Sequence, residues 1–122
     1  MASDEVTLKL VLFHITSQDL VDDALALGFY HCPSLTEEGF IHCCQLEQLS
    51  GVIDRYYADD PDLCLLVIER DLLTAPVKFE NTVGGDELFP HVYGPINVTA
   101  VSKIKNGSSA TLRRMTVKES IG

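Results

Sequence analysis

The segment Phe40–Cys43 reads Phe-Ile-His-Cys and places a titratable ring inside a run of apolar, strand-forming residues. A histidine in such a run must find hydrogen-bond partners or lose its charge, because burying an unpaired polar group costs free energy. Segments of the same character lie upstream, at Phe13–Thr16, and downstream, at Phe89–Gly94. We therefore predict that His14, His42 and His91 converge on one polar cleft.

The two flanking segments each allow a second interpretation. His14 ends a predicted strand just before a helix N-terminus, a setting that favours anions, but it is equally suited to a hydrogen bond with a backbone carbonyl. The segment Phe89–Gly94 holds a proline and a glycine beside His91 and Tyr93, as ligand-binding loops often do. It is equally suited to a packed loop whose aromatic rings cover a sheet edge.

The chain length and composition predict one globular domain spanning residues 1–122. It has 122 residues, of which 46% are hydrophobic and 22% charged, enough for a real core. Residues 1–6 are expected to form a frayed leader without the features of a secretion signal. The longest apolar run is about the length of a strand, so we expect a cytoplasmic protein that does not interact with membranes.

Four cysteines stand at positions 32, 43, 44 and 64, and we expect all of them to be reduced and free of metal. Zinc is the alternative for the two His-Cys pairs at 31–32 and 42–43. Neighbouring strand residues point in opposite directions, however, and the spacing matches none of the usual zinc ligand sets. Cys44 shares a predicted strand face with His42, which leaves a cysteine nucleophile as a further alternative.

The charge is unevenly distributed along the chain. Residues 1–98 hold 4 Lys+Arg and 17 Asp+Glu, a net charge of −13, whereas residues 99–122 carry a net charge of +4. An acidic body argues against binding of duplex nucleic acid, which depends on neutralising phosphates. The basic tail at 106–122 would either meet an anion or lie on the acidic body; if the chain is an interaction module, the tail would dock a protein partner.

Hydrophobic periodicity predicts an α+β fold with two early helices followed mainly by strands. The helices are expected over Ser17–Gly28 and Gln45–Tyr57. A loop or short strand is expected over residues 29–36, and Pro90, Gly94 and Pro95 argue against regular structure over 89–97. The expected strands cover residues 7–16, 40–43, 63–69, 77–80 and 100–105, with a further edge strand over 111–117.

Several ordered motifs resemble one known family, the "domain of unknown function" family numbered 952. They are Phe13–Thr16, Gly28-x-Tyr30, Pro33–Leu35, Glu38–Cys43, Leu66–Glu69 and Phe89–Pro95 followed by x-Asn97. The resemblance runs from about Leu12 to Ile104. Two positions depart from the family pattern: Val21 stands where a tryptophan is common, and Cys44 where a serine is common.

The resemblance implies a wider kinship with the ADP-ribosyltransferase-like fold, a split, mostly antiparallel sheet with two helices packed on it. That fold includes enzymes that cleave NAD and RNA 2′-phosphotransferases. His14-Ile15-Thr16 resembles its dinucleotide-contacting motif at the first and third positions, and residues 39–42 resemble a later strand beside the nicotinamide pocket. His91 is the first candidate for the third element, and Glu80 and Asn97 are the next candidates.

By this resemblance the chain would bind NAD, ADP-ribose or another phosphorylated nucleotide, and would act on it as a transferase or hydrolase. His14 would hold ribose or phosphate, His42 would face the reacting ribose, and His91 would close the cleft, which makes these three the candidate catalytic residues. The candidate nucleotide-binding residues are Thr16, Tyr30, Ser34, Tyr93 and Asn97. The alternative is a binding or protein-interaction module on the same fold that performs no catalysis.

Overall fold

The protein, described here by a computed structural model of residues 10–82 and 84–114, has an α+β fold in which every strand pairing is antiparallel. The strands are β1 (Val11–Thr16), β2 (Phe29–Tyr30), β3 (Ile41–His42), β4 (Leu63–Glu69), β5 (Val77–Glu80), β6 (Phe89–Val92), β7 (Ile96–Asn97) and β8 (Val101–Gly107). The helices are α2 (Gln18–Leu27), α3 (Pro33–Glu38), α4 (Leu46–Tyr56) and α5 (Ser109–Arg113), with short 3₁₀ turns η1 (Arg70–Leu72) and η2 (Val98–Ala100). The predicted α+β class with mostly antiparallel sheets is confirmed, but the described residues hold four helices where two were expected.

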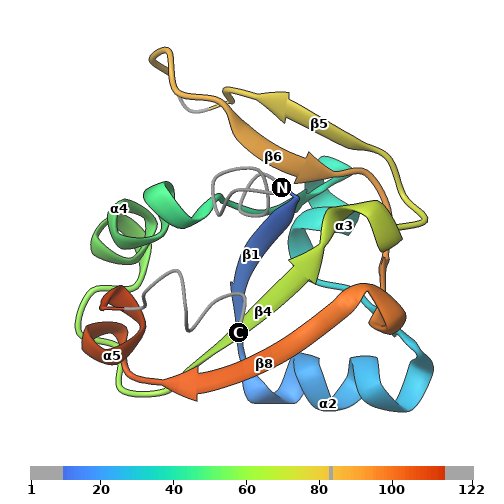
Figure 1. Ribbon diagram of the computed structural model, residues 1–122, viewed down its shortest axis with the longest axis horizontal. Coiled ribbons are helices and arrows are strands. Elements are labelled where there is room, and N and C mark those ends of the chain that lie inside the picture. The colour runs from blue at the N-terminus through green and yellow to red at the C-terminus, as the bar shows by residue number, and fades with distance from the viewer. Residues whose placement is uncertain (1–9, 83, 115–122) are drawn as a thin grey trace, which may run out of the picture.

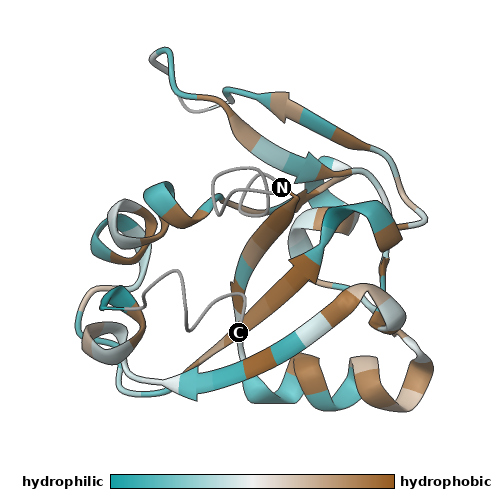
Figure 2. Ribbon diagram, in the orientation of Figure 1, coloured by the Kyte–Doolittle hydropathy of each residue, from teal (hydrophilic) through white to brown (hydrophobic). Residues whose placement is uncertain are grey.

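The centre of the molecule is the sheet β1-β4-β8, with β4 in the middle (Figure 1). β1 and β4 are mainly apolar, with His14 and Thr16 as the polar residues of β1, whereas β8 alternates polar and apolar residues (Figure 2). Alternate residues of a strand face opposite sides of a sheet. One core cluster accordingly holds Leu12, Leu66 and Ile68 with α2, and a second holds Phe13, Leu65 and Val67 with α4 and α5.

Helix α2 begins and ends where the sequence predicts. Ser17 is the N-cap and its side chain accepts a hydrogen bond from the Leu20 N–H at 3.4 Å. Gly28 ends the helix in the left-handed conformation, φ 87°, which a residue without a Cβ adopts at little cost. The helix buries Val21 and Ala24 against the sheet, while the predicted apolar residue Leu27 is exposed.

Helix α4 covers the other face of the central sheet and is held by a capping box. The Gln45 backbone N–H donates to the Gln48 side chain at 2.9 Å, and the Gln45 side chain accepts from the backbone in return. Leu49 and Ile53 are buried against β1 and β4. Because the helix starts directly after residues 43–45, it carries the chain away from the edge of β1.

A second sheet, β3-β6-β5, stands beside the open edge of β1, and its β5–β6 hairpin projects beyond the central sheet (Figure 1). The two sheets are joined through an isolated bridge between Phe13 and Cys44. A two-stranded sheet, β2-β7, lies next to α2. The sequence therefore builds two sheets that meet at β1, and the space beyond their junction is the site described below.

The expectations for two irregular segments hold only in part. Residues 29–36 contain the expected short strand, β2, but also the unpredicted helix α3, which starts at Pro33, a residue well suited to the first turn of a helix. Residues 89–97 contain β6 and β7 in spite of their prolines. Pro90 is tolerated inside β6 because its carbonyl still accepts a hydrogen bond, from the Cys43 N–H at 3.0 Å.

The expected edge strand over 111–117 is wrong where it can be compared. Residues 109–113 form helix α5, for which Ser108 supplies the N-cap by accepting from the Thr111 N–H at 3.2 Å. Residues 115–117, like the expected leader 1–6 and strand residues 7–9, lie outside the described ranges. Arg113 of the basic segment pairs with Asp54 of α4 at 2.8 Å, so this part of it lies on the acidic body.

Candidate functional site

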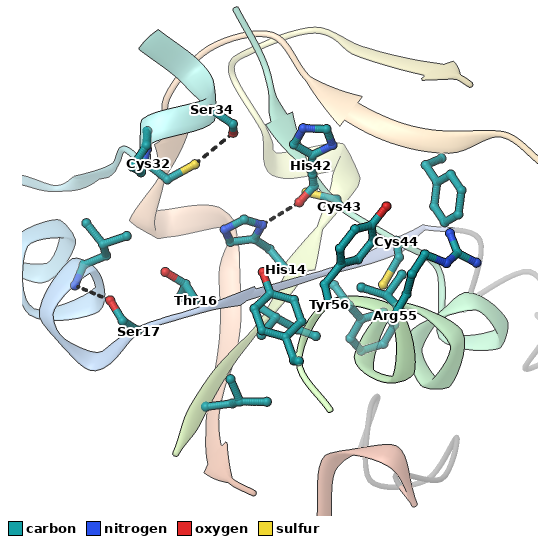
Figure 3. Close-up of a pocket in the computed structure, with 18 of the residues that line it drawn as sticks. His14, Thr16, Ser17, Cys32, Ser34, His42, Cys43, Cys44, Arg55 and Tyr56 are labelled. Carbon is teal, nitrogen blue, oxygen red and sulfur yellow. Dashed lines mark hydrogen bonds between the residues drawn. The ribbon is translucent and has the colours of Figure 1, made fainter. Parts of the chain in front are cut away.

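A pocket of about 710 Å³ lies along the free edge of β1, between the two sheets and the C-terminal half of α4 (Figure 3). Its wall is mainly apolar. The residues predicted as functional that line it are His14, Thr16, Tyr30, Ser34, His42 and His91. All three predicted histidines thus meet at one pocket, and in Figure 3 His14 lies at its centre with His42 directly beyond.

The edge of β1 is open at Ile15. Phe13 and Cys44 exchange both backbone hydrogen bonds at 2.8 Å, so the Phe13 N–H and C=O point away from β4. Backbone groups of residues two apart in a strand point the same way. Ile15 therefore also directs its N–H and C=O away from β4, but the chain after Cys44 turns into α4, and no partner for them exists within residues 10–82 and 84–114.

His14 is held at both ring nitrogens. Nδ1 lies 2.5 Å from the backbone oxygen of His42, and Nε2 lies 2.7 Å from the hydroxyl of Tyr30. The Tyr30 oxygen also lies 2.7 Å from Oγ1 of Thr16. Burial lowers the pKa of His14 to about 4. The ring is therefore neutral near pH 7, with its proton on Nδ1, because a carbonyl oxygen can only accept.

His91 has a carboxylate partner instead. Its Nδ1 lies 3.0 Å from Oε1 of Glu80, and the hydroxyl of Tyr93 donates to the same oxygen at 2.6 Å. Hydrogen bonds from Tyr93 and His91 lower the pKa of the Glu80 carboxyl, so Glu80 is ionised near neutral pH. Glu80, which the sequence analysis ranks after His91 as a site candidate, is thus bonded directly to His91.

Phe40 joins the second sheet's aromatic rings into one cluster. Its ring stacks on His91 with centroids 4.2 Å apart and meets the rings of His42 and Tyr93 at 4.8 Å and 5.3 Å. His42 is the exposed member, and its Nε2 lies 2.9 Å from Glu38. Phe40 was not among the predicted functional residues, because an apolar residue in a strand carries no chemical pattern of its own.

Two predicted contacts are supported by position and one is corrected. Thr16 and Ser34 line the pocket, and the Ser34 hydroxyl donates to the Phe40 carbonyl at 2.9 Å. Tyr30 was predicted to stack on a ligand, but the residue is 1% exposed, which leaves no open ring face for stacking. Tyr30 therefore positions His14 and Thr16 and has no ring face to offer.

Tyr93 and Asn97 lie outside the pocket wall, and their predicted roles are corrected. Tyr93 holds Glu80, and its ring lies 4.9 Å from the ammonium of Lys78. The Asn97 amide is fully used inside the fold: Oδ1 accepts from the Thr74 N–H at 3.0 Å, and Nδ2 donates to Leu72 and Thr99 at 2.9 Å and 2.8 Å. The sequence around Asn97 gave no indication that this amide holds the segment that follows β4.

The pocket wall holds few charges. Arg55 is the single Lys or Arg among the described lining residues, and its guanidinium lies 5.8 Å from the Tyr56 ring. Asp60 and Asp62 are the acids that line it. Sequence analysis missed Arg55 and Tyr56; a cation in the last turn of an amphipathic helix usually has a sufficient explanation in the helix dipole.

The thiols show no sign of activation. Burial raises the pKa of Cys44 to about 12 and raises that of Cys43 as well, which removes the setting that a cysteine nucleophile requires. All four cysteines are free. Among residues 10–82 and 84–114 there is no group of three or more His, Cys, Asp or Glu side chains placed to hold a metal ion. Nor does this part of the chain contain a helix long and apolar enough to cross a membrane.

Comparison with known proteins gives one family and no activity. The family model described as "Protein of unknown function (DUF952)" matches residues 15–104. The chain is similar to the crystal structure of protein CC0527 from Caulobacter crescentus, with 29% identity, a TM-score of 0.70, and coverage of 79% of this chain and 84% of that one. It is similar to the solution NMR structure of the same protein, with 29% identity, a TM-score of 0.67, and coverage of 79% and 83%. No curated protein matches the chain.

Proposed function

The chain belongs to the DUF952 family, and from the geometry of its pocket we propose that it binds a nucleotide: NAD, ADP-ribose or another phosphorylated nucleotide. The observation that carries the proposal is the open edge of β1 at Ile15, which offers one backbone donor and one backbone acceptor to a mainly apolar pocket. A nucleobase edge or a carboxamide presents the complementary acceptor and donor. Such a ligand would satisfy two backbone groups that otherwise lack protein partners.

The length of the open edge favours a small ligand over a peptide. Phe13 is already paired with Cys44, and helix α2 is capped at Ser17, so Ile15 is the one residue between them that is open on this side, along the pocket. Strand addition by a peptide depends on a row of free backbone groups. A single planar group needs one residue. This difference favours small-molecule binding over the alternative, a module that recognises a protein.

The size and charge of the pocket fit the same class of ligand. Its volume of about 710 Å³ lies within the range of small-molecule sites, roughly 300–1,000 Å³. Apolar walls suit the faces of a heterocycle, and Arg55 suits a phosphate because a guanidinium can donate two parallel hydrogen bonds to it. The neutral ring of His14 contributes no charge, so Arg55 rather than His14 is our candidate for the phosphate.

The finer fold assignment is part of this proposal. An ADP-ribosyltransferase-like split is supported by the position of the pocket between sheets β1-β4-β8 and β3-β6-β5, with His14-Ile15-Thr16 along it. We propose a cytoplasmic protein, which the four free thiols support, since cysteines stay reduced in that compartment.

Binding without turnover is the form of the function that the carboxylates support best. Cleavage of a nicotinamide–ribose bond needs a carboxylate or dipole facing the positive charge that develops. The two carboxylates of the aromatic cluster, Glu38 and Glu80, are each hydrogen-bonded to a histidine and do not line the pocket. The two acids that do line it, Asp60 and Asp62, lie in the loop before β4, where Asp62 is exposed and Asp60 Oδ1 accepts from the Asp62 N–H at 3.0 Å. A transferase or hydrolase is retained as the second candidate, because the three histidines do line it.

The proposal is tested by thermal unfolding with NAD, ADP-ribose, AMP, nicotinamide and inorganic phosphate, each added separately. A ligand at a hundred times its dissociation constant should stabilise the fold by about 2.7 kcal/mol. We expect stabilisation by at least one nucleotide and little by phosphate alone. Proton NMR of the same samples over time would show turnover as the appearance of new ligand signals.

A matched pair of variants on α4 locates the binding. Val52 lines the pocket, whereas Ser50 is exposed and does not. Val52→Trp should fill the pocket and abolish the nucleotide-induced stabilisation, and Ser50→Trp should leave it intact. Stabilisation that survives Val52→Trp would place the ligand elsewhere, and no stabilisation by any nucleotide would reject the proposal.

A further inference from the structure

His91 combines nearly complete burial with an unused ring nitrogen. The residue is 2% exposed and lines the pocket. Its Nδ1 is bonded to Glu80, but Nε2 makes no hydrogen bond to any residue of the described ranges. Within those ranges no fully buried side-chain nitrogen or oxygen lacks a partner. Nε2 must therefore reach open space, and the open space beside this residue is the pocket.

The partners of Nδ1 decide what Nε2 can do. An ionised carboxylate only accepts hydrogen bonds, so Glu80 fixes the proton of the neutral ring on Nδ1. Tyr93 donates to the same Glu80 oxygen and holds it in place. In the neutral ring the lone pair is therefore on Nε2, which can accept a hydrogen bond and cannot donate one.

The aromatic cluster fixes the direction of that lone pair. Phe40 lies nearly parallel to the His91 ring, at an interplanar angle of 18°, and His42 meets the ring edge-on with centroids 5.2 Å apart. A turn of the His91 ring would break its bond to Glu80 and lose the stacked contact. The acceptor is thus preorganised before a ligand arrives, which lowers the cost of binding.

Resting on the proposed function, we propose that His91 Nε2 is the acceptor for a sugar hydroxyl and that the pocket selects ribonucleotides over the corresponding deoxynucleotide. A nucleotide carries two kinds of donor, base or amide N–H groups and sugar hydroxyls. Phosphate oxygens, which carry negative charge, would face the lone pair unfavourably. Because a planar base or carboxamide is assigned to Ile15, the hydroxyls are the donors left for His91. Glu80 acts through His91 and is a positioning residue.

The first test needs no ligand. Two-bond proton–nitrogen NMR correlations of the histidine rings report directly which nitrogen carries the proton. We expect the Nδ1–H form for His91 in the unmodified protein and in Glu80→Gln, whose amide oxygen can still accept. Glu80→Leu should lose the fixed form, whereas Glu37→Leu, which removes an exposed carboxylate from α3, should keep it. An Nε2–H form in the unmodified protein would overturn the inference whatever the binding results.

The second test compares AMP, 2′-deoxy-AMP and 3′-deoxy-AMP by calorimetric titration. One deoxy form should bind about tenfold or more weakly, because the acceptor is left unpaired in a buried position. Glu80→Leu should reduce this discrimination to below about threefold, and both Glu80→Gln and Glu37→Leu should preserve it. A purely structural role of Glu80 would change unfolding but leave the discrimination unchanged.

The outcomes separate this inference from the proposed function. Equal binding of AMP and both deoxy forms would overturn the hydroxyl contact and leave nucleotide binding in place. Binding of NAD or ADP-ribose without binding of AMP would also overturn it, since AMP carries the sugar in question. If no nucleotide in the panel binds, the proposed function fails first and the hydroxyl assignment fails with it.

Discussion

His14 and His91 are two buried histidines that line one pocket and carry the proton on the same ring nitrogen, yet they differ in what Nε2 meets. In His14, Nε2 lies 2.7 Å from the hydroxyl of Tyr30, a residue that is 1% exposed. In His91, Nε2 has no hydrogen-bond partner among the described residues. Both ring nitrogens of His14 are thus hydrogen-bonded within the fold, whereas one ring nitrogen of His91 is left for a ligand.

The difference shows that the partner of the distal nitrogen, more than burial, separates a structural histidine from a binding one. His14 ties β1 to the backbone of β3 through the His42 carbonyl, and so joins the two sheets. His91 is also held, by Glu80 and Phe40, but its Nε2 has no partner among the described residues, and the residue lines the pocket. The predictions below test this division of roles, starting with the largest effect.

Removing the His14 ring should cause the largest loss of stability. His14→Ala leaves the Tyr30 hydroxyl and the His42 carbonyl without their partner and creates a cavity, so we expect a loss of about 4 kcal/mol in the free energy of unfolding. Urea denaturation measures this loss. His31→Ala, at an exposed histidine, is the matched control and should change stability by less than about 0.5 kcal/mol. Equal effects of the two variants would break the comparison.

The depressed pKa of His14 predicts that stability falls in mild acid. The pKa is 6.5 when unfolded and about 4 when folded, so the unfolded chain binds the extra proton between these values. The contribution is fully present above pH 6.5, decreases as the pH falls, and is lost below about pH 4. It amounts to about 3 kcal/mol. Urea denaturation from pH 7 to pH 4 should show this slope, and His14→Gln should flatten it.

The lowered pKa of Glu80 affects a different window. A carboxylate stabilised in the folded state contributes above its ordinary pKa of 4.5 and loses that contribution as the pH falls further. Stability loss between pH 6.5 and 4.5 therefore reports on His14. A loss of stability confined to the region below pH 4.5 would mean that the folded protein already binds a proton at His14 above that pH, and would contradict the structural role of this ring.

Two tyrosines provide a matched pair for the hydroxyl contacts. Tyr30→Phe removes the partner of His14 Nε2 inside the core, and we expect a loss of about 2 kcal/mol. Tyr93→Phe removes a partner of Glu80, which is partly exposed to water, and should cost less than about 1 kcal/mol. Thermal or urea unfolding of both variants measures the difference. A larger loss for Tyr93→Phe would reverse the assignment of structural roles.

The smallest effect is expected at the exposed ion pair. His42 and Glu38 have side chains that are 45% and 47% exposed, so water screens their interaction. Glu38→Gln should change the free energy of unfolding by less than about 0.5 kcal/mol. A loss several times larger would show that His42, like His14, has a structural role.

The sequence predicts the elements of this fold better than the contacts at the site. Helix α2 and strands β4 and β5 follow from periodicity and caps, because Ser17, Gly28 and the apolar run at 63–69 act locally. The convergence of His14, His42 and His91 also follows from their position in apolar segments. Which nitrogen of each ring is used does not, since Tyr30 and Glu80 are brought to the rings by tertiary packing.

The open edge at Ile15 could not be predicted for a similar reason. A backbone group is left free there because Cys44 pairs with Phe13 and the chain then turns into α4. No residue type marks such a place. For Asn97 the sequence predicted a binding role that the structure does not support. Its side chain is hydrogen-bonded to the segment after β4.

The most direct test of the central claim is a titration of the nitrogen-15-labelled protein with NAD, ADP-ribose and AMP, followed at the backbone amide of Ile15. The Phe13 amide, already bonded to Cys44, is the control within the same spectrum. We expect the Ile15 resonance to move with saturable binding and its exchange with solvent to slow, with a smaller change at Phe13. Saturable binding that leaves Ile15 unchanged, or no binding by any of the three nucleotides, would contradict the account.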